Sequence, residues 1–286
     1  MTRKNYCTVI IAITIAMVVA TGNAGPNGAK MRSLHEVLGV QGTAQHKSAR
    51  ADRPFLSETG GAANPKVYGK TYGEWGAAWW QWALSFPVGE SPIQDETGEF
   101  CDKGQSGPVW FLAGSEGVSG VERACTIPAG KAIFYPIIAS TWTDCPFSGD
   151  EDLSDEEVRW IMAAFAQGGD NACVLTSTLD TFEVFGADEP AAISALQRPA
   201  VRSQSPVFTW NVPDEGAAVD FGCDVPFPPG ETGRAIAEGY WVMLPPLSVG
   251  EHVLNLRGAA NCGTEFFFET EVTYHLTVVP GQGRGN

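Results

Sequence analysis

The alternation of apolar and polar residues is strictest near the end of the chain, over residues 268–278. Polar residues fill the odd positions, and the even positions hold Thr270 together with Phe268, Val272, Tyr274, Leu276 and Val278. A period of two places successive side chains on opposite faces of a strand. The segment therefore predicts a strand with one buried and one solvated face, as in an antiparallel sheet.

Further short runs of β-branched and aromatic residues are separated by Gly, Pro, Asn and Asp. Such runs predict strands, here over residues 108–113, 131–138, 172–177, 206–210, 239–244 and 252–257. Turn residues at 245–250 separate the last two of these runs. Strands at this spacing predict a mainly β fold, an antiparallel two-sheet sandwich with two or three short helices. A closed β-barrel is the alternative.

A different period marks the segment from Tyr72 to Ser85, which predicts a helix. Thr71 and Glu74 have the spacing of a capping box, and Pro87 disfavours helical geometry at the residue before it. At 100° per residue one apolar stripe forms, which consists of Trp75, Trp79, Trp82 and Phe86. We expect this stripe to pack against a sheet.

Trp80 projects away from the stripe and is the indole most suited to face a cleft. Exposed aromatic rings can hold a sugar ring, and Trp110 is a second candidate for that role. The sequence therefore nominates Trp80 and Trp110 as ligand-binding residues.

A second helix is predicted from Ser154 to Gly168. Ser154 and Glu157 have capping-box spacing, Leu153 can pack on Val158, and the apolar face consists of Val158, Ile161, Met162 and Phe165. Acidic residues surround this helix, among them Asp144, Asp150, Glu151 and Asp152. They lack the order of an EF-hand loop, so we expect no cofactor, with calcium as the alternative.

The first residues predict export. Arg3 and Lys4 precede an apolar run from Thr8 to Ala20, which is short for a membrane span and typical of a signal peptide. Cleavage is expected after Ala24 or Ala20. Residues 25–66 then predict a flexible lead-in, residues 67–280 a single β-rich domain, and residues 281–286 a disordered tail. The expected location is extracellular or periplasmic, with no membrane span after cleavage.

Six cysteines remain after removal of the signal peptide, which are Cys101, Cys125, Cys145, Cys173, Cys223 and Cys262. An even number in an oxidising compartment predicts three disulfides. Pairing of sequence neighbours would join Cys101 to Cys125, Cys145 to Cys173, and Cys223 to Cys262. No free thiol would then remain for catalysis or zinc.

The net charge of −15 excludes some partners. An acidic field repels phosphate backbones and anionic lipid surfaces, which argues against nucleic acid and membrane surfaces. The oligomeric state is left open.

Three blocks of the chain resemble those of a group of exported bacterial and archaeal proteins with no assigned activity. They are YGEW and WWQWA within residues 72–83, GQSGPVWFLAG at 104–114, and CTIPAGKAIFYPII at 125–138. The resemblance spans most of residues 67–278 and implies a single extracellular domain. It carries over no catalytic residue.

The residues available for catalysis are few. The predicted domain holds two histidines, His252 and His275, and no G-x-S-x-G motif, so a serine triad would need one of these two. Both also fit ordinary strand positions. A carboxylate pair for glycoside hydrolysis would draw on Asp95, Glu99 and Asp102, although Asp95 also fits a turn.

The sequence therefore favours a secreted binding protein over an enzyme, with an extracellular glycan as the expected ligand. Two alternatives remain. One is a secreted hydrolase that uses a carboxylate pair, and the other is a structural or adhesive surface protein without a small ligand.

Overall fold

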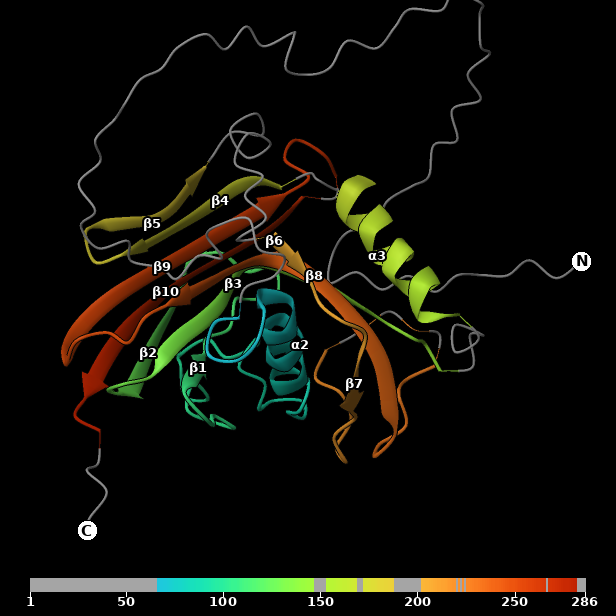
Figure 1. Cartoon of the computed structure of the whole chain (residues 1–286), viewed down its shortest axis with the longest axis horizontal. Helices are drawn as coiled ribbons and strands as arrows, with labels where there is room; N and C mark the ends of the chain where they lie inside the picture. The colour runs from blue at the N-terminus through green and yellow to red at the C-terminus, as the bar shows by residue number, and fades with distance from the viewer. Residues whose placement is uncertain are drawn as a thin grey trace, which may run out of the picture. The chain divides into compact units, whose positions relative to one another are not determined.

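The structure is a computed structural model, and it describes residues 66–146, 153–168, 172–187, 202–219, 221, 223, 225–265 and 267–281. The predicted signal peptide, all but Lys66 of the predicted lead-in and all but Gly281 of the predicted tail lie outside the described residues. Ten described strands form two sheets (Figure 1).

Sheet I has the strand order β1-β3-β8-β6, and β7 also pairs with β8. Its strands are β1 (Val109–Phe111), β3 (Ala132–Thr143), β6 (Arg202–Gln204), β7 (Phe208–Asn211) and β8 (Thr232–Leu244). Sheet II has the order β2-β10-β9-β4-β5. Its strands are β2 (Val121–Pro128), β4 (Ala172–Leu179), β5 (Phe182–Ala187), β9 (Gly250–Ala260) and β10 (Phe268–Val279).

The predicted two-sheet architecture is confirmed, and all seven predicted strands are present. Both strand orders are open, so the alternative of a closed barrel is wrong. The sheets are mixed rather than wholly antiparallel, because β1 pairs parallel with β3 and β2 pairs parallel with β10. Parallel neighbours need a long crossover between them, and periodicity along the chain does not reveal such a pairing.

The inner faces of the two sheets enclose one of the two large core clusters. The even-numbered residues of β10 are all buried, as their alternation predicts. Of these, Val272, Tyr274 and Leu276 pack with Leu254 and Leu256 of β9 and with Ile133, Tyr135 and Ile137 of β3. The hydroxyl groups of Tyr135 and Ser177 lie 2.8 Å apart and join the sheets by a hydrogen bond. Burial of these faces is the main stabilising contribution, at about 25 cal/mol per Å² of apolar surface.

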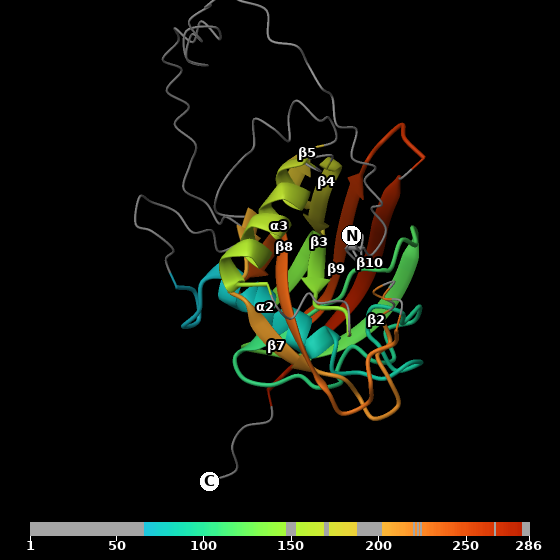
Figure 2. The same ribbon diagram turned by 90° about the vertical axis from the view of Figure 1, so that its right-hand side faces the viewer.

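Helix α2 (Tyr72–Ala83) covers the other face of sheet I (Figure 2). The capping box is present: the N–H of Thr71 donates to Glu74 Oε2 at 2.7 Å, and the N–H of Glu74 donates to Thr71 Oγ1 at 3.2 Å. The predicted stripe is buried against Phe134 and Trp241, whose rings stack 5.2 Å apart. The helix prediction is therefore confirmed.

Helix α3 (Asp155–Gly168) packs at the far end of β3 and β8. Its predicted capping box is also present, because the N–H of Ser154 donates to Glu157 Oε2 at 2.8 Å. Val158 and Met162 are buried against Trp142 and Ile236, as the apolar face predicts. The side chains of Ile161 and Phe165 lie outside the described residues.

Three disulfides form, as the even cysteine count predicts. Cys101 pairs with Cys125, but the other two predicted pairings are wrong: Cys145 pairs with Cys223, and Cys173 with Cys262. The physical reason is strand adjacency. Because Ala172 of β4 lies opposite Ala260 of β9, the cysteines that follow these residues meet at one end of sheet II.

Candidate functional site

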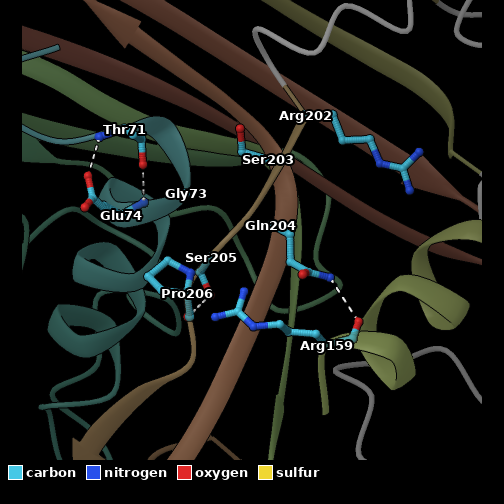
Figure 3. Close-up of a pocket in the computed structure, with 9 residues that line it drawn as sticks. All are labelled: Thr71, Gly73, Glu74, Arg159, Arg202, Ser203, Gln204, Ser205 and Pro206. Atoms are coloured by element: carbon cyan, nitrogen blue, oxygen red, sulfur yellow. Dashed lines mark hydrogen bonds between the residues drawn. The ribbon is translucent and has the colours of Figure 1, made fainter. Parts of the chain in front are cut away.

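A polar cavity of about 490 Å³ lies between the start of α2, edge strand β6 and the N-terminal half of α3 (Figure 3). Its lining residues are Thr71, Gly73, Glu74, Arg159, Arg202, Ser203, Gln204, Ser205 and Pro206. The volume lies in the range of small-molecule sites. Hydroxyl, amide, carboxylate and guanidinium groups all face this cavity.

Two local features hold α2 against β6. A Cβ atom at Gly73 would lie 2.3 Å from the carbonyl oxygen of Gln204, so only glycine permits this close approach. After β6 ends, the N–H of Ser205 donates to the carbonyl of Ala237, and the N–H of Ala237 donates to Ser205 Oγ. The start of α2 and the end of β6, which line the cavity, are therefore held by close backbone packing and by hydrogen bonds to β8.

The charged groups of the cavity differ in their partners. Arg202 Nε donates to Glu238 Oε1 at 2.8 Å, which neutralises much of its charge. Glu74 accepts the N–H of Thr71, and this hydrogen bond lowers its pKa, so the group is ionised at neutral pH. Arg159 has no ion-pair partner among the described residues, and its side chain extends across the cavity towards Ser205 and Pro206. Arg159 is thus the cation available to an anionic ligand.

Trp160 follows Arg159 on α3 and is 69 % exposed, the most exposed indole of the described residues. It lies off the buried face formed by Val158 and Met162, so packing does not explain it. Trp160 was not among the predicted ligand-binding residues. Its position between two buried residues, on the opposite side of the helix, is the pattern that could have found it.

The two nominated ligand-binding tryptophans lie in the core. Trp80 is 2 % exposed and packs in the cluster around α2, whereas Trp110 is 6 % exposed and packs between the sheets. The expectation that Trp80 faces a cleft is therefore wrong. The physical reason is that α2 is covered on more than one side, by sheet I and by the segments that follow β1 and β7. The indole N–H groups of both have no hydrogen-bond partner.

The three nominated carboxylates do not converge on a cleft. Asp95 is buried, and its oxygens accept the N–H groups of Thr97, Gly98 and Phe100, as expected for a turn. Burial raises the pKa of Asp95, but these hydrogen bonds outweigh it and lower the pKa overall. Glu99 and Asp102 are exposed. Asp95 is thus occupied in holding the turn, and it is not poised to donate a proton.

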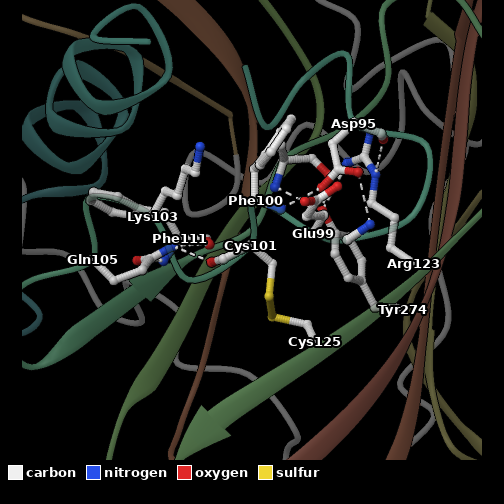
Figure 4. Close-up of a disulfide and its surroundings, with 12 residues drawn as sticks. Asp95, Glu99, Phe100, Cys101, Lys103, Gln105, Phe111, Arg123, Cys125 and Tyr274 are labelled. Carbon is white, nitrogen blue, oxygen red and sulfur yellow. Dashed lines mark hydrogen bonds between the residues drawn. A yellow bond between two sulfur atoms is a disulfide. The ribbon is translucent and has the colours of Figure 1, made fainter. Parts of the chain in front are cut away.

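Arg123 is buried beneath this turn, beside the Cys101–Cys125 disulfide (Figure 4). Its guanidinium donates to Tyr274 Oη and to four carbonyl oxygens, which belong to Ile93, Asp95, Ala113 and Gly114. All of these acceptors are uncharged. The arrangement anchors the loop between α2 and β2 to sheet II, and we assign it to stability.

A third polar cluster lies at one end of sheet II, where the segment from Pro245 to Val249 crosses from β8 to β9. His252 Nδ1 lies 2.9 Å from Asp180 Oδ2, and His252 Nε2 lies 3.3 Å from Ser248 Oγ and 3.0 Å from the Ser248 carbonyl oxygen. The N–H of Val253 donates to Asp180 Oδ1 at 2.8 Å. Sequence reasoning noted His252 but missed Ser248 and Asp180, because the pairing of β4 with β9 brings Asp180 to His252 from 72 residues away.

Within the described ranges, no group of three or more His, Cys, Asp or Glu side chains could hold a metal ion. Asp150, Glu151 and Asp152 of the predicted calcium alternative lie outside the described residues, and Asp144 pairs with Arg234 at 2.7 Å. The expectation about calcium stays a prediction. In the part of the chain that the structure describes, no helix is long and apolar enough to cross a membrane.

Comparison with known proteins adds no family assignment. No family model, no curated protein and no solved structure matches the chain. A functional conclusion therefore depends on the chemistry of these sites.

Proposed function

We propose that the protein is an exported binding protein whose ligand is a saccharide that carries a carboxylate. The observation that carries this proposal is the guanidinium of Arg159, which extends into a polar cavity and has no carboxylate partner among the described residues. The signal-peptide pattern and the three disulfides support export.

The other groups of the cavity suit a sugar. Each sugar hydroxyl both donates and accepts hydrogen bonds, and the cavity offers an acceptor at Glu74 and hydroxyl groups at Thr71 and Ser203. A carboxylate on the sugar could form a bidentate pair with Arg159. Trp160, next in sequence and exposed, offers a flat ring for a second sugar.

The overall charge of −15 restricts how many negative charges the ligand can carry. A polymer with many negative charges would be repelled by the acidic surface. A ligand with one carboxylate interacts mainly with the nearest cation, since salt screens charges beyond about 8 Å. We therefore expect a short saccharide with a single acidic group rather than a polyanion.

Titration calorimetry with mono- and oligosaccharides, with and without a uronic acid, tests the proposal. Arg159→Ala should weaken binding of the acidic sugar roughly 10- to 100-fold, the loss expected for a hydrogen bond to a charged group. Arg257→Ala is the charge-matched control: Arg257 lies on β9, outside the cavity, and pairs with Glu269 of β10, so binding should not change.

Three outcomes would contradict the proposal. Equal affinity of the Arg159→Ala and Arg257→Ala variants would place the ligand elsewhere. Absence of binding to every saccharide would instead favour the structural or adhesive alternative. Release of reducing ends from a bound glycan would favour a glycoside hydrolase.

A further inference from the structure

The cluster of Ser248, His252 and Asp180 has the connectivity of a nucleophile, a base and a group that orients the base. Ser248 Oγ lies 3.3 Å from His252 Nε2, and Asp180 Oδ2 lies 2.9 Å from His252 Nδ1. Such a constellation is recognised by geometry and roles rather than by sequence order. None of these residues belongs to the saccharide cavity.

Asp180 is held in a fixed position. It starts the two-residue turn between β4 and β5 with φ of +54°, a left-handed conformation that aspartate tolerates. Its Oδ1 accepts the N–H of Val253, which leaves Oδ2 directed at His252 Nδ1. This contact favours the tautomer with the proton on Nδ1.

With the proton on Nδ1, neutral His252 presents a lone pair at Nε2. Ser248 Oγ is the hydroxyl within reach of this lone pair at 3.3 Å. The distance is long for an activated serine, but hydrogen bonds between catalytic groups often tighten only when substrate binds. When His252 is protonated, Nε2 instead donates to the Ser248 carbonyl oxygen at 3.0 Å. His252 Nε2 thus donates to the Ser248 carbonyl when the ring is protonated and can accept from Ser248 Oγ when the ring is neutral.

We infer that Ser248, His252 and Asp180 form a hydrolytic site that acts on carboxylic esters. Ser248 Oγ attacks the ester carbonyl while His252 Nε2 takes the hydroxyl proton. The C–O bond to the alcohol then breaks, and the imidazolium gives its proton to the leaving alkoxide. Water, deprotonated by His252, attacks the acyl-serine, and the carboxylic acid leaves as Ser248 regains its proton. Ester and water thus become acid and alcohol.

The backbone N–H of Val249 directly follows Ser248, the place from which a donor can stabilise the oxyanion of such a reaction. This N–H has no hydrogen-bond partner among the described residues. It is therefore available to the tetrahedral intermediate.

Esters fit this site better than amides. The site lies at the surface, with Ser248 exposed, so little surrounds a substrate. An alkoxide leaves with less assistance from an acid than an amine, which must be protonated before it departs. Two apolar side chains close in sequence to Asp180 and Ser248 are largely exposed, Phe182 at 65 % and Val249 at 57 %. They favour a short apolar acyl group.

A fluorophosphonate probe and p-nitrophenyl butyrate test the inference on the exported full chain. We expect the probe to label the wild-type protein, with peptide mapping that places it on Ser248. Ser248→Ala and His252→Gln should lower the hydrolysis rate roughly 100-fold or more, the usual contribution of a general base. Asp180→Asn tests a positioning residue: it should lower the rate and move the rise of the pH–rate profile to lower pH, because the carboxylate contributes to the raised pKa of His252.

The chain contains matched controls. His275 Nε2 lies 2.5 Å from Glu122 Oε2 on the outer face of sheet II, so His275→Gln removes a histidine with a carboxylate partner from elsewhere on the same sheet. Ser119→Ala removes an exposed serine that is bonded to Glu269. Both variants should keep the wild-type rate and labelling.

The inference is wrong if wild-type protein takes no label and hydrolyses no ester, or if Ser248→Ala is labelled as strongly as wild type. It is also wrong if His252→Gln and His275→Gln change the rate equally. Melting temperatures measured for each variant separate loss of activity from loss of folding.

Discussion

The indole N–H of Trp79 donates a hydrogen bond of 2.9 Å to the carbonyl oxygen of Leu112, 33 residues further along the chain. Trp75 and Trp82 make equivalent bonds to the carbonyls of Val67 and Lys103. The stripe of α2 therefore does two things: its rings fill the core beside sheet I, and its N–H groups hold the surrounding loops. Trp80 differs, because its N–H is buried without a partner.

This difference predicts unequal costs for two similar substitutions. Trp79→Phe and Trp80→Phe remove the same atoms from buried positions, but only the first leaves a buried carbonyl without its donor. Trp79→Phe should therefore lower the free energy of unfolding by about 1–3 kcal/mol more than Trp80→Phe. Urea denaturation of the two variants measures the difference. Equal losses would show that the Leu112 bond contributes nothing net.

The disulfides give a prediction about covalent structure. Peptide mapping without reduction should find Cys145 linked to Cys223 and Cys173 linked to Cys262. It should find no link between Cys145 and Cys173 or between Cys223 and Cys262. Replacement of each pair by alanines should destabilise most for the longest loops, by about 4.5 kcal/mol for separations of 78 and 89 residues and about 3.4 for 24 residues, in the chain-entropy description. Thermal unfolding of the three double variants tests this order.

Arg123 should be among the most sensitive positions of the fold. Arg123→Met removes five hydrogen bonds to buried or partly buried acceptors, and each buried group left unsatisfied costs about 1–3 kcal/mol. We expect a melting temperature lower by well over 10 °C, or failure to accumulate as folded protein. Arg257→Met on the surface of β9 is the control and should change stability by less than about 1 kcal/mol. Comparable losses in both variants would contradict the structural role of Arg123.

The pair of His252 and Asp180 predicts how stability depends on pH. Burial alone would lower the pKa of His252, but the hydrogen bonds with Asp180 and the Ser248 carbonyl raise it overall. The stability that protonated His252 contributes is therefore present below about pH 6.5 and is lost as pH rises through the raised pKa. Burial raises the pKa of Asp180, but its bonds with His252 and the Val253 N–H lower it overall, so its contribution is lost in acid.

The pair therefore stabilises most between roughly pH 4 and pH 6.5. The difference in melting temperature between wild type and His252→Gln should be largest there and should shrink towards pH 9. A difference that does not change with pH would show that the pair does not titrate in this way. His275→Gln serves as the comparison, because the His275 side chain is about half exposed.

Several features were predictable because they depend on residues close together in the sequence. Both capping boxes use a side chain and a backbone group three residues apart, and both are present. The alternation in β10 needs only that one face of a strand be buried. The number of disulfides was also predictable, because it follows from an even number of cysteines in an oxidising compartment and does not depend on which cysteines are neighbours in the fold.

Strand β2 (Val121–Pro128) was not among the predicted strands. Val121, Cys125 and Ile127 alternate correctly, but the inward position between them holds Arg123. A charged residue at an inward position argues against a half-buried strand when only the sequence is known. The structure accommodates it because carbonyl groups from distant loops surround the guanidinium. Periodicity cannot show that such partners exist.

The sequence by itself thus determined both helices, seven of the ten described strands, the mainly β class and the number of disulfides, because each depends on composition or on spacing of a few residues. Only the tertiary structure decided the disulfide partners, the burial of Trp80, the cavity around Arg159, and the meeting of Asp180 with His252. Each of these depends on which strands become neighbours. Strand order follows from the packing of the whole chain, and residues 72 positions apart come into contact only after β4 and β9 have paired.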